Sequence, residues 1–261
     1  IGYAAGDAIT TASHNTFVGH EAGTATTGSN NTGIGRHALT ANTSGINTAV
    51  GYRALDANTT GTSNVAIGVD ALGGNVDGDQ SVAIGTEALL VQDPSGNADM
   101  NNVAVGYRAG YAITTGVSNV LIGSGAGDGF DTESNNTAVG FGALGGGSYA
   151  ATGNTAIGYN AGTSITTGAS TVLVGDYAGD AITTGTGNVL MGSAAGGAIT
   201  TGGYNTIVGY NAGDAITTSS EHTLIGSSSG GALTSGTALT AVGFEAGKLI
   251  STGSNNTLIG H

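Results

Sequence analysis

A pair made of an aliphatic residue and a glycine recurs along the whole chain. The residue before the glycine is Ile, Val or Met every time, and the residue before that is almost always nonpolar. The glycines are Gly2, Gly19, Gly35, Gly51, Gly68, Gly85, Gly106, Gly123, Gly140, Gly158, Gly175, Gly192, Gly209, Gly226, Gly243 and Gly260. They lie 16 to 18 residues apart, except for one interval of 21. A fixed period of this length predicts a solenoid rather than a globular core.

Each coil can be numbered from this glycine, taken as position 0. Positions −3 to −1 predict a strand that is apolar on both faces, whereas a strand wetted on one side would alternate. We therefore expect one face to lie against the interior of the coil and the other against a second copy of the chain. The segment that starts at position +7, commonly Ile-Thr-Thr-Gly as at Ile165–Gly168, predicts an outer strand with one wet face.

Several other columns describe the interior and its corners. Position −4 is Asn in 11 of 15 coils, which predicts a ladder of stacked, turn-forming side chains at one corner. Representative members are Asn15, Asn64, Asn102, Asn154 and Asn256. Position +3 is Ala in 14 of 15 coils, which predicts a second corner that admits only a small side chain.

Positions +4 and +7 compensate each other within this one sequence. Where +4 is Gly, +7 is apolar in nine of ten coils, and where +4 is Leu, +7 is Asn, Gln or Gly. We infer that one aliphatic side chain per coil fills the same interior slot from either position. An unfilled slot would cost on the order of 1 kcal/mol or more in each coil.

These patterns predict an all-β fold, a parallel β-solenoid (β-roll) of 15 coils of about 17 residues, with no helix, as a single repeat array over residues 1–261. A coil this thin encloses little core, so lateral association with identical chains is expected to supply the missing burial. Both ends fall in the middle of a repeat, which favours a fragment of a longer fibre.

The composition narrows the function. Charged residues make up 8% of the chain, far below the usual ~25%, which is unlike an ordinary soluble enzyme. Four Lys and Arg against 17 Asp and Glu argue against nucleic-acid binding. No apolar run approaches the ~20 residues of a membrane span, so no membrane insertion is expected. No catalytic set of nucleophile, base and acid is legible, and we expect neither enzymatic activity nor a cofactor.

The repeat resembles a known family. The stretches Asn-Asn-Thr-Ala-Val-Gly-Phe (Asn135–Phe141) and Asn-Thr-Ala-Ile-Gly-Tyr-Asn-Ala-Gly (Asn154–Gly162) resemble the head repeat of YadA-like trimeric autotransporter adhesins. They look closer still to the 17-residue arrays in phage tail fibres and bacterial surface proteins that precede an intramolecular chaperone domain. The adhesin heads have shorter coils, of about 14 residues. The chaperone protease uses a Ser-Lys pair, and the only lysine here, Lys248, lies within a repeat, so we do not expect that domain in these residues.

The resemblance covers all coils and implies a homotrimeric, extracellular fibre, part of a virion tail fibre or of a bacterial cell surface. It implies the shaft or head of an adhesin that attaches to a glycan or protein receptor on a cell surface. The alternatives are a ligand-free spacer and an ice-binding solenoid that uses the Thr column at position +8, although neighbouring Thr residues are expected to point to opposite faces. The default interpretation of that column is a set of polar residues on the outer face of the coil, without a ligand.

Candidate receptor contacts fall into two groups. An aromatic stripe at position +1 includes Tyr52, Tyr107, Tyr159 and Tyr210, whose rings suit stacking on sugars but are more often a packing ladder. The 21-residue coil contains Asp93 and Asn97 in an insertion that is expected on the binding face, and Tyr149 in the 18-residue coil is a second candidate.

No metal site is expected. Acidic turns such as those at Asp77 and Asp79 are interpreted as solvated surface that keeps a fibre soluble. His20 and His37 lie in successive coils, but as +1 and +2 residues their side chains are expected to point apart.

Overall fold

The computed structural model describes residues 1–147 and 150–261. Its regular structure in these residues is β-strand, and each strand of the repeat ends immediately before the position-0 glycine. The chain divides into two compact units, Ile1–Ser134 and Asn135–His261, and each is a stack of the same coil. The predicted all-β parallel β-solenoid is confirmed, with about 14 coils of about 17 residues. It has fewer coils than glycine intervals because no strand forms before Gly2.

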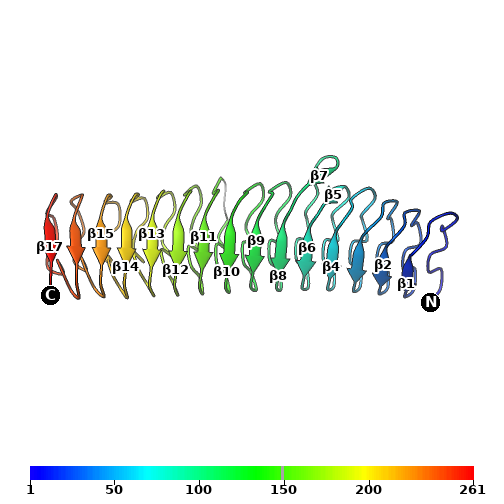
Figure 1. The fold of residues 1–261 in the computed structure, drawn as a ribbon, viewed down its shortest axis with the longest axis horizontal. Helices are drawn as coiled ribbons and strands as arrows, with labels where there is room; N and C mark the ends of the chain where they lie inside the picture. The colour runs from blue at the N-terminus through cyan, green and yellow to red at the C-terminus, as the bar shows by residue number, and fades with distance from the viewer. Residues whose placement is uncertain (148–149) are drawn as a thin grey trace. The chain divides into compact units, whose positions relative to one another are not determined.

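Each unit contains one parallel sheet with one short strand per coil, drawn as the row of arrows in Figure 1. The first unit contains β1 (Thr16–Val18), β2 (Thr32–Ile34), β3 (Thr48–Val50), β4 (Val65–Ile67), β6 (Val82–Ile84), β8 (Val103–Val105) and β9 (Val120–Ile122), together with a separate pair, β5 (Gly78–Asp79) and β7 (Ala98–Asp99). The second unit contains β10 (Thr137–Val139), β11 (Thr155–Ile157), β12 (Val172–Val174), β13 (Val189–Met191), β14 (Thr206–Val208), β15 (Thr223–Ile225), β16 (Thr240–Val242) and β17 (Thr257–Ile259). Within the described part of the chain, no helical segment has the length and hydropathy that crossing a bilayer requires.

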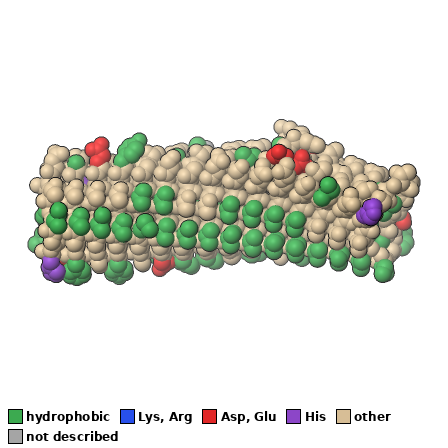
Figure 2. All heavy atoms as spheres, viewed as in Figure 1, with side chains coloured by type: hydrophobic (Ala, Val, Ile, Leu, Met, Phe, Trp, Pro, Cys, Tyr) green, Lys and Arg blue, Asp and Glu red, His purple; other side chains and the backbone are tan. Residues whose placement is uncertain are grey.

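Each sequence column pairs with itself from coil to coil. Ala66 of β4 lies beside Ala83 of β6, and Leu173 of β12 lies beside Leu190 of β13. Position −2 points into the coil and is buried in β1 to β16. Position −1 points outward: Ile67 is 38% exposed and Met191 is 41% exposed. The inward face is therefore packed as predicted, whereas the outward apolar face is open to solvent in the chain. Figure 2 shows apolar side chains in rows over the strands of each unit.

The position-0 glycine is required by space and by conformation. Gly68 has a φ of +141°, and a Cβ on it would lie 2.5 Å from the carbonyl oxygen of Gly85 in the next coil. No side chain fits there, because real Cβ atoms do not approach backbone so closely. Stacking coils at strand spacing thus explains why this column is always glycine.

The interior slot is confirmed, and it is shared by three columns rather than two. A Cβ on Gly179 at position +4 would lie 2.8 Å from Ile182 Cδ1 and 2.8 Å from Leu173 Cδ2, at positions +7 and −2. Where +4 is Leu, position −2 is always small. Those five residues are Gly33, Ala49, Ala66, Ala83 and Ala138. A large residue at +4 therefore excludes large residues at −2 and +7, whereas −2 and +7 are both large where +4 is Gly, as in the coil of Leu173 and Ile182.

The polar +7 residues of the Leu coils form a buried ladder that the pattern did not predict. Asn58 Nδ2 donates to Asn42 Oδ1 at 2.8 Å, and Asn75 Nδ2 donates to Asn58 Oδ1 at 3.2 Å. Gln92 Nε2 continues the ladder to Asn75 Oδ1 at 3.0 Å. All four side chains are buried, so their amides satisfy one another from coil to coil inside the first unit.

The Asn column at position −4 clamps each coil to the next. Asn64 Oδ1 accepts the Ser81 N–H at 2.9 Å, and Asn64 Nδ2 donates to the Gly78 carbonyl at 2.7 Å. Asn15, Asn102 and Asn154 make the same kind of Nδ2 contact, and Asn256 is exposed in the last coil. The ladder runs mainly through the backbone of the next coil, and stacked side chains also bond directly, as where Asn205 Nδ2 donates to Asn188 Oδ1 at 3.0 Å. The left-handed residue is the one before the Asn, as at Ser63 with a φ of +60°.

The predicted outer strand is wrong for most coils. Among the described residues, the pair β5 and β7 is the one place where strands form on that side. In the Ile-Thr-Thr-Gly segment of the second unit, the N–H groups of Thr166, Thr167 and Gly168 all donate to the single carbonyl of Thr183, at 2.9, 3.2 and 3.2 Å. Three donors converging on one acceptor cannot form the evenly spaced ladder of a parallel strand.

Candidate functional site

The aromatic stripe at position +1 lies on the surface of both units. Tyr52, Tyr107, Tyr159 and Tyr210 are 41% to 59% exposed, so their rings are accessible on at least one face. Other residue types interrupt the column, since Val69 and Ser193 occupy the same position in other coils. The stripe is therefore a set of short runs rather than one continuous ladder.

The run of stacked rings in the second unit includes a residue that the sequence pattern missed. Phe141 stacks on Tyr159 with ring centroids 5.3 Å apart, and Tyr177 meets Tyr159 edge-on at 5.2 Å. A hydrogen bond with the Tyr159 hydroxyl raises the pKa of the Tyr177 phenol. Tyr177 occupies position +2, not +1, with a φ of +53°. A left-handed residue at the corner turns its side chain toward the +1 column, which strand alternation does not predict.

The 21-residue coil carries Asp93 and Asn97 on its surface, and the loop that ends at β7 projects from its unit in Figure 1. Asp93 Oδ1 accepts the Val76 N–H at 3.2 Å, and the side-chain amide of Asn97 lies 2.7 Å from the Thr60 hydroxyl oxygen. Both side chains thus tie the insertion to earlier coils. Tyr149, the second candidate, lies outside the described residues.

A shallow groove of about 490 Å³ lies beside this insertion. Its lining includes Arg53, Asp70, Leu90, Val91 and Asp93. Arg53 is held by Asp56 at 2.8 Å and by Asp70 at 3.6 Å, so its charge is already paired. The structure brings Asp93 to this groove, whereas Asn97 is not among its lining residues.

The acidic turns at Asp77 and Asp79 are engaged in hydrogen bonds to the preceding coil. Asp77 Oδ1 accepts the Thr60 hydroxyl at 2.6 Å, and Asp79 Oδ1 accepts the Thr62 N–H at 2.5 Å. Partial burial raises the pKa of the Asp128 and Asp180 carboxyls at position +5. The hydrogen bonds of Asp77 and Asp79 thus join their turns to the preceding coil.

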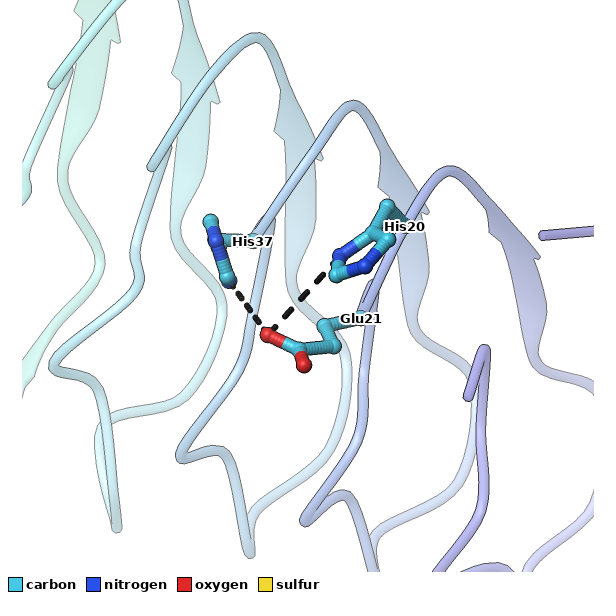
Figure 3. Close-up of side chains that lie close together, drawn as sticks. All are labelled: His20, Glu21 and His37. Atoms are coloured by element: carbon cyan, nitrogen blue, oxygen red, sulfur yellow. Dashed lines mark ion pairs between the residues drawn. The ribbon is translucent and has the colours of Figure 1, made fainter. Parts of the chain in front are cut away.

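The expectation that His20 and His37 point apart is wrong. Together with Glu21 they form the one group of three metal-ligating side chains found in the described part of the chain, with donor atoms within 4.8 Å of one another. The alternation rule fails because positions +1 and +2 lie in a turn after the strand, where Glu21 and His37 have φ values of +57° and +60°. Figure 3 shows the Glu21 carboxylate between the two imidazole rings.

We compared the chain with known protein families, sequences and structures. No protein-family model matches the chain, and no curated protein sequence or solved structure shows significant similarity to it. The fold stands on the structure itself, and the resemblance to adhesin and tail-fibre repeats stands on the repeat motif.

Proposed function

We propose that the chain is a non-enzymatic structural and adhesion module, the shaft or head of an extracellular phage tail fibre or bacterial surface adhesin. In this proposal three copies associate side by side, and the assembly attaches to a glycan or protein receptor on a cell surface. The observation that carries the proposal is the outward face of the strands, which is uncharged in every coil and has an aliphatic residue or Met at position −1.

The outward face has the chemistry of a protein interface. Its −1 column is Ile, Val or Met, and its −3 column is Thr or Val, in all 15 strands. Soluble monomers rarely expose a contiguous apolar patch of more than a few hundred Å², and interface cores are depleted of charge. An identical copy offers the same columns at the same coil spacing, so the two match coil by coil. This repetition favours self-association over an unrelated partner.

Attachment is assigned to the exposed aromatic rings and to the insertion of the 21-residue coil. Both interrupt the regular repeat at the surface, and insertions in solenoids commonly lie on a binding face. The run formed by Phe141, Tyr159 and Tyr177 presents flat apolar rings beside polar hydroxyls, which suits the mixed surface of a sugar.

A glycan array probed with the intact chain tests the attachment role. Tyr159→Ser is expected to reduce binding at least about fivefold if the stacked run is the contact, since a buried aromatic contact is worth about 1 kcal/mol or more. Tyr204→Ser is the matched control, because Tyr204 is an exposed tyrosine outside the run and Ser63 occupies the same repeat position. An array without hits contradicts glycan attachment and favours the ligand-free spacer.

The structure gives no support to the ice-binding alternative. Hydroxyls of the Thr column bond to the next coil: Thr166, Thr183 and Thr200 each donate to a backbone carbonyl at 3.1 Å. A hydroxyl has a single donor, so in these residues the donor serves coil stacking rather than an ordered water layer. We therefore do not propose ice binding.

A further inference from the structure

The three side chains His20, Glu21 and His37 converge on one point at the surface of the first unit. His20 and Glu21 follow β1, and His37 follows β2, so the group spans two adjacent coils. Glu21 Oε2 lies 3.1 Å from His37 Nδ1 and 3.8 Å from His20 Nδ1. Figure 3 shows all three side chains directed toward the same space.

The backbone fixes this arrangement. The His37 N–H donates to the His20 carbonyl at 3.0 Å, which sets the two turns at hydrogen-bonding distance. The left-handed conformation of Glu21 and His37 turns both side chains toward the +1 column. Neighbouring rings limit the imidazoles further: Tyr3 stacks on His20 at 5.2 Å, and Tyr52 meets His37 edge-on at 6.2 Å.

The spacing fits the first coordination shell of a transition metal. Bonds of about 2.0–2.2 Å in a tetrahedral site place neighbouring ligand atoms about 3.4 Å apart. The distances from Glu21 Oε2 to the two Nδ1 atoms, 3.1 and 3.8 Å, lie on either side of that value. The side chains of His20, Glu21 and His37 are 48%, 35% and 23% exposed, so an ion has access from solvent and small ring rotations can close the shell.

An ion pair is a weak explanation for the cluster. Exposed pairs of this kind contribute about 0–1 kcal/mol, and each imidazole must be protonated to take part in one. Two imidazoles and one carboxylate are, by contrast, a common three-ligand set for Zn²⁺, with water in the fourth position. Imidazole also suits the neighbouring metals Cu²⁺ and Ni²⁺.

We propose that His20, Glu21 and His37 form a surface site for a divalent transition metal, with Zn²⁺ as the representative ion. The ion bridges the coils of β1 and β2 and cross-links them at the N-terminal end of the first unit. Because it binds the folded array and not the unfolded chain, it raises the thermal stability of that unit. The site is independent of the proposed attachment role.

Isothermal titration calorimetry of the tag-free chain with ZnCl₂ tests the proposal. The expected result is one Zn²⁺ per chain, with a loss of affinity in His37→Asn or Glu21→Asn that exceeds the roughly 10- to 100-fold effect of removing an outer-shell partner. Asn is chosen because Asn160 and Asn211 occupy the same left-handed position, with φ values of +50° and +51°. These variants should therefore fold, which circular dichroism verifies.

His14→Asn is the control, since His14 lies outside the cluster and Asn30 occupies the same repeat position. It should bind Zn²⁺ as the unaltered chain does. X-ray absorption at the zinc edge should report two imidazole nitrogens, and Zn²⁺ should raise the melting temperature of the unaltered chain but not of His37→Asn. An unaltered chain that does not bind Zn²⁺, or equal affinity in His37→Asn, overturns the proposal.

Discussion

The shared interior slot can be tested by a double-mutant cycle in the second unit. Gly179→Ala places a Cβ 2.8 Å from Ile182 Cδ1, which overpacks the slot. We expect a loss of about 1–3 kcal/mol from overpacking, together with about 1 kcal/mol because alanine adopts a φ of +56° less readily than glycine. Ile182→Val removes only Cδ1, and such truncations cost about 0.5–1.5 kcal/mol.

The double variant separates the slot from general destabilisation. The new Cβ would also lie 2.8 Å from Leu173 Cδ2 and 2.9 Å from Leu190 Cδ1, so valine removes one of the three close contacts. The double variant should therefore lose less than the sum of the single losses, by about 0.5–2 kcal/mol. The free energy of unfolding is measured by urea denaturation followed by circular dichroism. Gly125→Ala is the control for backbone conformation alone, because its φ is +66° and a Cβ there would lie 3.5 Å from Asp128 Oδ2, an ordinary contact. Additivity within about 0.3 kcal/mol in the Gly179 and Ile182 cycle would refute the shared slot.

Three further variants test individual columns. Ser229→Ala, which restores the alanine of position +3 and removes a buried hydroxyl without a hydrogen-bond partner, should raise the free energy of unfolding by about 1 kcal/mol in urea denaturation, and a loss would contradict this. Ile46→Asn, at an exposed β-branched residue with a φ of +65°, should stabilise by about 1 kcal/mol, measured in the same way, and an unchanged urea midpoint would count against backbone strain there. Burial lowers the pKa of His222 from 6.5, and its Nδ1 accepts the Leu239 N–H, so the ring is neutral in the fold. The unfolded chain then binds the proton more readily than the folded chain, so the free energy of unfolding should fall as the pH drops below about 6.5. His222→Asn should remove this part of the pH dependence, which urea titrations at different pH measure. The same pH dependence in His222→Asn and in the unaltered chain would contradict this assignment.

The sequence predicted the coil well because stacking imposes the same constraint at every repeat. The repeat shows the glycine at position 0 and the small residue at +3 as columns. It also shows the compensation between +4 and +7, where one coil has Gly179 with Ile182 and another has Leu72 with Asn75. Each reflects packing against the adjacent coil, which leaves a periodic trace in the sequence.

What the sequence could not show lies at the corners, where the backbone is left-handed. Residues such as Tyr177 and His37 adopt positive φ values without any distinctive residue type, so strand alternation misplaced their side chains. The same error hid the convergence of His37 with Glu21. The outer strand was predicted from the polarity of its residues alone. Polarity does not reveal the backbone hydrogen bonding, in which the Thr166 N–H and its two successors share one carbonyl.

The central claim is that copies of this chain cover the apolar outward face of the strands. Light scattering coupled to size-exclusion chromatography measures this directly on the intact chain. Three times the chain mass of 24.9 kDa is the predicted result. Substituting outward residues such as Ile67 and Ile157 with Lys should dissociate the assembly, whereas a chain that elutes as a 24.9 kDa monomer without any substitution would contradict the account.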